Sequence, residues 1–227
     1  MTQETKIAGK IFWHDLLTYE PEKAMDFYHQ LIGWEYQPFD MGPAGTYNMI
    51  KVGEQTRGGF MNPQGKNVAA HWCAYTWVDD VDETAKRVTT LGGKLVGPTD
   101  IPDVGRFAVA FDPQGASMAF MNGKDAPSAD LPRPQPREFC WDEMMADDPE
   151  GAKGFYGELF GWAFEKRDMG KMGDYWIGMR GEHQTVGIAK KPREVPAPPH
   201  WLAYIYVEDL DATTSKAKQL GGDILTP

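Results

Sequence analysis

Two histidines and two carboxylates recur at matching places in the chain. His71 and His200 open similar segments, and Asp15 and Glu143 each follow a tryptophan by two residues. Imidazole and carboxylate groups bind divalent ions, and a carboxylate whose pKa is raised by burial can act as a general base. A divalent metal site built from these four residues is one hypothesis. The alternative, favoured by the strict demands of ligand count and geometry, is that the histidines form local hydrogen bonds and the acids pair with polar neighbours.

Aromatic side chains accompany these candidates, again in matching pairs. Alternation along a strand places Trp13 on the same face as Asp15, and Cys73 and Tyr75 on the same face as His71. An aromatic cleft with a few polar groups is typical of a small-molecule site. The predicted ligand-binding residues are Trp13, Asp15, Tyr47, His71, Cys73, Tyr75, Trp141, Glu143, Tyr175, His200 and Tyr204. The plainer interpretation is that the aromatic residues fill a core and that Cys73 is a buried small hydrophobe.

The matching pairs belong to a duplication. The stretch FWHDLLTYEPEKAMDFYHQLIGWEY from Phe12 aligns with FCWDEMMADDPEGAKGFYGELFGWAF from Phe139, so that Trp13 is matched by Trp141 128 positions later. So many aligned aromatic residues and glycines indicate two copies of one domain. We predict a first domain over 1–123, a stiff proline-rich linker over 124–137 and a second domain over 138–227.

A weaker repeat lies inside each copy. An apolar strand is followed by an acidic helix start such as Glu20-Pro21-Glu22, by an amphipathic helix and by a glycine that ends it. Short strands then follow, broken by turns such as Asp112-Pro113-Gln114-Gly115. This pattern predicts an α+β fold of tandem domains, each made of paired βαβββ repeats. Whether neighbouring repeats pair in order or exchange between the domains stays open.

These features give the chain a specific resemblance. The motif FY…LxG after the first helix and GRFAVAFDPQGASMAF near a domain end are similar to the vicinal-oxygen-chelate superfamily, which comprises glyoxalases, bleomycin-resistance proteins and dioxygenases. The motifs LFGW and HWxAYxxV further resemble a two-domain, glyoxalase-like bacterial subgroup. The resemblance covers nearly the whole chain and implies the fold, whereas a fold does not determine a reaction.

The resemblance also implies where a metal site would lie, and the residues there do not suit one. Enzymes of the superfamily hold one divalent ion with His, Gln or Glu from four strand positions, where it acts as a Lewis acid. Here the first position is Trp13 or Trp141, and the second falls in residues 58–62, which contain no Asp, Glu or His. The third falls on Cys73 and Leu202 and the fourth on Ala119. The family site is therefore expected to be dismantled.

The second copy ends early relative to the first. The first copy continues beyond Pro98 with IPDVGRFAVAFDPQGASMAFMN, whereas the printed chain stops at the matching residue, Pro227. We therefore expect the last βαβββ repeat to lack its closing strands. By analogy with the first copy, we also expect the natural protein to continue for roughly 25–30 residues.

Composition and net charge limit the kinds of protein that this chain can be. Hydrophobic residues make up 41% and charged residues 25% of the 227 residues, as in soluble globular proteins. The net charge of −10 argues against a nucleic-acid surface, and no apolar run approaches the length of a membrane span. Two separated cysteines and the absence of a secretion signal favour the cytoplasm. We expect a monomer or a homodimer.

Three functions are consistent with these observations. The first is a protein that binds a small, partly aromatic molecule without a metal cofactor, as the bleomycin-resistance branch does. The second is an enzyme of lyase, isomerase or oxygenase-related type, using a rearranged divalent-metal site or a carboxylate base, for which no catalytic residue can be assigned. The third is an interaction module with a vestigial cavity. Loss of the family ligands favours the first.

Overall fold

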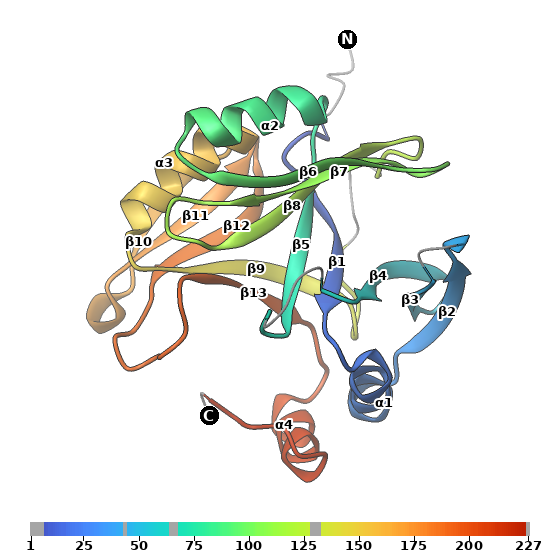
Figure 1. Ribbon diagram of the computed structural model, residues 1–227. Helices are drawn as coiled ribbons and strands as arrows, with labels where there is room; N and C mark the ends of the chain where they lie inside the picture. The colour runs from blue at the N-terminus through green and yellow to red at the C-terminus, as the bar shows by residue number, and fades with distance from the viewer. Residues whose placement is uncertain (1–6, 43–44, 64–67, 128–132, 226–227) are drawn as a thin grey trace. The chain divides into compact units, whose positions relative to one another are not determined.

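The computed structural model describes residues 7–42, 45–63, 68–127 and 133–225 and shows strands and helices in mixed order (Figure 1). The strands are β1 (Ile11–Leu17), β2 (Glu35–Asp40), β3 (Thr46–Val52), β4 (Gln55–Met61), β5 (His71–Trp77), β6 (Lys94–Ile101), β7 (Gly105–Phe111), β8 (Ser117–Gly123), β9 (Phe139–Ala146), β10 (Ala163–Asp168), β11 (Asp174–Arg180), β12 (His183–Lys190) and β13 (His200–Ile205). The helices are α1 (Pro21–Ile32), α2 (Val81–Thr90), α3 (Pro149–Phe160) and α4 (Leu210–Gln219), and a 3-10 turn spans Gly170–Met172.

The order of these elements confirms the α+β class and the βαβββ repeat. The pattern occurs as β1-α1-β2-β3-β4, β5-α2-β6-β7-β8 and β9-α3-β10-β11-β12, and β13 and α4 begin a fourth repeat. Residues 220–225, which follow α4, form no strand. Hydrogen bonding orders the strands as β2-β3-β4-β1-β5-β8-β7-β6 and as β10-β11-β12-β9-β13. Within each complete repeat, the first strand lies beside the last strand and runs parallel to it.

The chain divides into two compact units that do not follow the order of the repeats. The first unit comprises 1–13, 73–132 and 141–204, and the second comprises 14–72, 133–140 and 205–227. Most of the second and third repeats thus share one unit, and most of the first repeat shares the other with α4. The domain boundaries predicted along the sequence stay a prediction, and residues 128–132 of the predicted linker lie outside the described residues.

The first unit is built on two capped helices. The N-cap aspartates Asp80 and Asp148 accept hydrogen bonds from the backbone N–H groups of Glu83 at 3.0 Å and Gly151 at 3.1 Å, which satisfies donors that a helix start leaves open. Helix α2 packs on β6, β7 and β8, and α3 packs on β10, β11 and β12. The two helices lie side by side (Figure 1). Acidic side chains thus cap both helices of this unit, whereas Glu20, at the start of α1, makes no side-chain cap hydrogen bond.

A buried series of hydrogen bonds connects α3 to the turn after β7 and to strand β13. Tyr156 is 1% exposed, and its Oη donates to Asp112 Oδ2 at 3.2 Å and accepts from Trp201 Nε1 at 2.9 Å. Burial raises the pKa of the Tyr156 hydroxyl well above its usual value and, as the largest cause, also raises the pKa of Asp112. Because Trp201 belongs to β13, this chain holds the strand that carries Tyr204 in place.

The second unit has an aromatic core. Trp34 is fully buried and donates from Nε1 to the backbone oxygen of Arg137 at 2.8 Å, and Trp72 Nε1 donates to Tyr28 Oη at 3.0 Å. His14 is buried, with its ring stacked on Phe139 at a centroid distance of 3.9 Å. His14 is therefore a core histidine of this unit.

Candidate functional site

Strand β9 in the first unit presents two faces of different character. Asp142, Met144 and Ala146 are buried, whereas Trp141 and Glu143 alternate with them and are partly exposed. Side chains of a strand alternate between the faces of its sheet, so the buried set forms the core side. Trp141 and Glu143 therefore share the more open face, as the sequence predicted.

Tyr175 reaches this face from two strands away. It lies on β11, and its ring crosses β12 at Gly187, the residue that pairs with Glu143. A Cβ atom at position 187 would overlap the Tyr175 hydroxyl and lie 3.0 Å from Trp141 Nε1. Gly187 is therefore required to leave space for the tyrosine. Gly187 was not among the predicted site residues, although its match with Gly59, 128 positions earlier, was a signal of its role.

The side chains converge on one carboxylate. Tyr175 Oη donates to Glu143 Oε2 at 2.7 Å and accepts from Trp141 Nε1 at 2.9 Å. Tyr204 Oη, from β13, donates to Glu143 Oε1 at 3.1 Å. These four residues, Trp141, Glu143, Tyr175 and Tyr204, are called the Glu143 cluster below. The structure thus brings together four predicted ligand-binding residues of the second copy.

The electrostatics of the cluster keep its tyrosine neutral. The pKa of Tyr175 is raised above its usual value, chiefly because burial disfavours the phenolate and also because the hydroxyl donates to Glu143. Tyr204 is 42% exposed, so the cluster reaches the molecular surface. A neutral phenol donates hydrogen bonds to a carboxylate, and the arrangement therefore presents a carboxylate held by two tyrosine donors.

The first copy contains a matching but more enclosed arrangement, which lies within the second unit. Tyr47 Oη donates to Asp15 Oδ1 at 2.5 Å, and Asp15 pairs with Gly59 in the β1–β4 register. A Cβ atom at Gly59 would overlap the Tyr47 ring and hydroxyl. Asp15 is 2% exposed, whereas Glu143 is partly exposed. The carboxylate–tyrosine pair is thus duplicated, and only Glu143 reaches solvent appreciably.

The two predicted histidines make local hydrogen bonds. His71 Nδ1 lies 2.8 Å from the backbone oxygen of Ala69, and His200 Nδ1 lies 2.7 Å from that of Pro198. The sequence-based expectation of local bonding is confirmed, as is the pairing of both carboxylates with polar neighbours.

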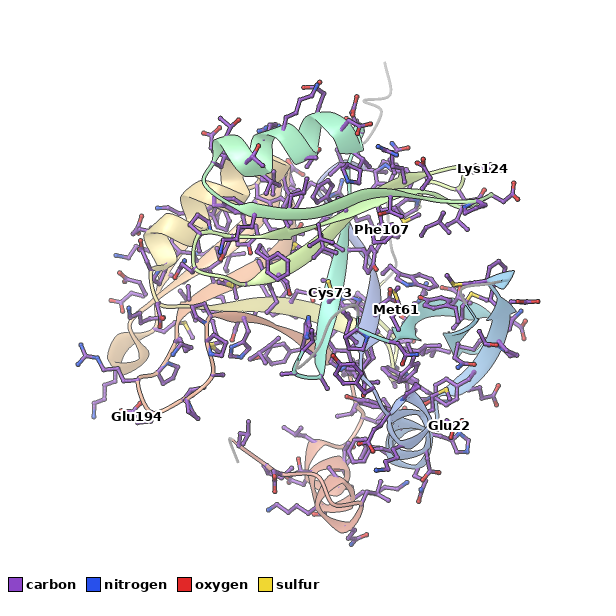
Figure 2. The ribbon with its side chains drawn as sticks, viewed as in Figure 1. Glu22, Met61, Cys73, Phe107, Lys124 and Glu194 are labelled. Carbon is purple, nitrogen blue, oxygen red and sulfur yellow. The ribbon has the colours of Figure 1, made fainter. Side chains whose placement is uncertain are left out.

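The remaining predicted residues of the first copy are mostly enclosed. Cys73 and Tyr75 lie on β5 in the first unit and are 2% and 6% exposed. The Tyr75 ring lies 6.3 Å from that of Phe107, which Figure 2 labels together with Cys73. Trp13 lies on β1 and is partly exposed. Their role in binding stays a prediction.

The positions that would hold the family's metal ion do not fit one. In the second copy they carry the indole of Trp141 and the alkyl chain of Leu202, and at Gly187, on the neighbouring strand, the Tyr175 hydroxyl fills the space that a side chain would need. Metal sites need several His, Cys or carboxylate ligands in a defined geometry. Within 7–42, 45–63, 68–127 and 133–225, no group of three or more His, Cys, Asp or Glu could hold an ion.

Comparison with known proteins agrees with the fold and the repeat. The family model of a glyoxalase-like domain matches residues 12–121, and that of the glyoxalase/bleomycin resistance protein/dioxygenase superfamily matches residues 142–227. The chain belongs to this superfamily. Two family matches in tandem confirm the resemblance and the two-copy layout drawn from the sequence.

Two curated relatives illustrate the similarity. CFP32 of Mycobacterium tuberculosis, whose name describes a proposed glyoxylase, is 39% identical over 120 residues, which cover 52% of this chain and 45% of CFP32. The chain thus matches less than half the length of that relative. The anthracycline biosynthesis protein DnrV of Streptomyces peucetius is 29% identical over 231 residues, covering 95% of this chain and 83% of DnrV.

Solved structures share the fold at low sequence identity. The 2,2',3-trihydroxybiphenyl 1,2-dioxygenase of Sphingomonas wittichii superposes with a TM-score of 0.64 at 15% identity, covering 97% of this chain and 81% of the enzyme. A halotolerant catechol dioxygenase, BphC, gives 0.60 at 13% identity, covering 95% and 76% of the two chains. At this identity the likeness concerns the fold alone.

Proposed function

We propose that this protein binds a small, partly aromatic molecule at the Glu143 cluster without the metal ion of its superfamily. The observation that carries the proposal is the convergence of two tyrosine hydroxyls on one partly exposed carboxylate, with Trp141 donating to one of those tyrosines. Aromatic surface with a few fixed polar groups is the usual composition of a small-molecule site. The polar groups give orientation, and the ring of Tyr204 gives apolar contact area.

The cluster is prepared for binding before a ligand arrives. Tyr175 is held by two hydrogen bonds and by its close fit over Gly187, so that little conformational freedom remains for it to lose. DnrV, named for anthracycline biosynthesis, is consistent with this reading because anthracyclines are polycyclic aromatic compounds. The alternative of an enzyme with a rearranged metal site finds less support, since among the described residues no group of three or more His, Cys, Asp or Glu could hold an ion.

Titration of intrinsic tryptophan fluorescence with bicyclic and tricyclic aromatic phenols and amines tests the proposal. The variant Tyr204→Ala should weaken binding about five- to tenfold, since an aromatic contact contributes about 0.5–1.5 kcal/mol beyond the buried area. Tyr206→Ala is the matched control, because Tyr206 is 45% exposed and belongs to no part of the cluster. Equal affinity of the two variants for every compound that binds would contradict the proposal.

A separate measurement addresses the metal. The purified protein is incubated with Ni, Zn, Mn and Fe(II), desalted and analysed for bound metal. We expect less than stoichiometric retention, because the side chains at the family positions cannot ligate an ion. A near-stoichiometric metal that is lost in a His200→Ala variant would instead favour the enzyme hypothesis.

A further inference from the structure

The hydrogen-bond partners of Glu143 are unusual for a partly buried carboxylate. Its partners are two phenol hydroxyls, and among the residues that the structure describes no Lys, Arg or His lies within ion-pair distance of Glu143. By contrast, the partly buried Glu138 in the second unit pairs with Arg57 at 2.7 Å. Carboxylates removed from water are normally compensated by a cation. Within the part of the chain that the structure describes, the Glu143 carboxylate therefore has hydrogen-bond donors but no cationic side chain as a partner.

The carboxylate also has unused capacity for hydrogen bonds. Two carboxylate oxygens offer about four lone-pair sites, and the tyrosines occupy two of them, one on each oxygen. The partial exposure of Glu143 leaves the remaining sites within reach of a ligand. The ligand group that binds most strongly at these sites is one that donates hydrogen bonds and carries a positive charge. A charge-assisted hydrogen bond is roughly twice as strong as a neutral one.

We propose that the ligand is an organic cation, a protonated amine on an aromatic body, whose ammonium group binds Glu143. This inference rests on the proposed function of the same cluster and adds the chemical class of the ligand. The phenol groups of Tyr175 and Tyr204 hold the carboxylate and Trp141 donates to Tyr175, so the aromatic body of a ligand bound at Glu143 would meet aromatic side chains beside it. The net charge of −10 adds a long-range attraction for cations.

The site is a single one for each chain. Asp15, the counterpart in the first copy, is 2% exposed and accepts a hydrogen bond from Tyr47 at 2.5 Å. An ammonium group cannot approach a carboxylate that is enclosed by protein. Of the two matching carboxylates, Glu143 is therefore the one that a ligand can reach, and one amine should bind to each chain.

The test compares two probes of nearly equal size, 1-naphthylmethylamine and the neutral 1-naphthalenemethanol, by calorimetric titration at pH 7. We expect the amine to bind about tenfold more tightly than the alcohol, with a stoichiometry of one. In Glu143→Gln the shape is kept and the charge is removed, so the preference should fall to about twofold or less. Glu182→Gln, which changes the net charge equally at an exposed position, should keep the full preference.

The outcomes separate the inference from the proposed function. Equal binding of both probes, weakened by Tyr204→Ala, would support the small-molecule site and refute the inference that its ligand is a cation. Binding of neither probe, nor of any aromatic compound in the fluorescence panel, would overturn both. Loss of the amine preference in Asp15→Asn but not in Glu143→Gln, with both variants folded by circular dichroism, would move the site to the first copy and refute the assignment.

Discussion

Substitution of Gly187 by alanine tests whether position 187 must be glycine because the Tyr175 ring packs over it. The backbone there is ordinary extended strand, paired with Glu143, so an alanine meets no conformational obstacle. Its Cβ would instead overlap the Tyr175 hydroxyl and approach Trp141 Nε1 to 3.0 Å. The tyrosine would have to leave, which breaks its hydrogen bonds to Glu143 and Trp141.

The expected cost can be worked from these contacts. A hydrogen bond to a charged group contributes about 1.5–3 kcal/mol and a neutral one about 0.5–1.5 kcal/mol, and part of both is regained when the groups bind water at this partly exposed site. We therefore expect Gly187→Ala to lower the free energy of unfolding by about 2–3 kcal/mol. In a protein of this size that lowers Tm by roughly 5–10 °C.

A double-mutant cycle assigns that cost to the tyrosine. Urea unfolding followed by circular dichroism is measured for Gly187→Ala, for Tyr175→Ala and for the double variant. Once the ring is removed, Gly187→Ala should cost less than about 0.5 kcal/mol, because only the contact with Trp141 Nε1 at 3.0 Å remains and a small shift of that side chain relieves it. An unchanged cost of 2–3 kcal/mol in the Tyr175→Ala background would show that the clash with the ring does not explain the glycine.

Three further predictions concern stability. Gly154 lies inside α3 with open space where a Cβ would be, so Gly154→Ala should raise the free energy of unfolding by about 0.5–1 kcal/mol, measured by urea titration. Tyr156→Phe should lower it by about 1–3 kcal/mol, because Asp112 loses a donor and Trp201 Nε1 loses its acceptor in a buried place; a change below 0.5 kcal/mol would contradict this account. Finally, the pKa values of Tyr156 and Tyr175 are raised in the folded state above the usual 10.0. Their contribution is fully present below the unfolded-state pKa of 10.0 and is lost as the pH rises through the folded-state values, so the urea midpoint should fall as the pH rises above 10, and less steeply in Tyr156→Phe.

Much of the local structure is determined by the sequence itself. Helix α3 begins after Asp148 with Pro149 in its first turn, and it ends at Gly161 with a φ of 73°, as the N-cap and glycine signals predicted. These signals act within a few residues and do not depend on the rest of the chain. Duplication of whole motifs then established the repeat, and alternation along β9 placed Trp141 and Glu143 on one face.

Only the tertiary structure decided which candidates act together. Nothing in the periodicity of β11 shows that the Tyr175 ring crosses β12, since that depends on the register that sets Gly187 beside Glu143. The hydrogen bond between Tyr204 and Glu143 likewise joins residues 61 positions apart, and it depends on how β13 lies beside β9. The difference in exposure between Asp15 and Glu143 could not be predicted from the repeat either, because the two carboxylates occupy matching positions and their burial depends on the surrounding strands.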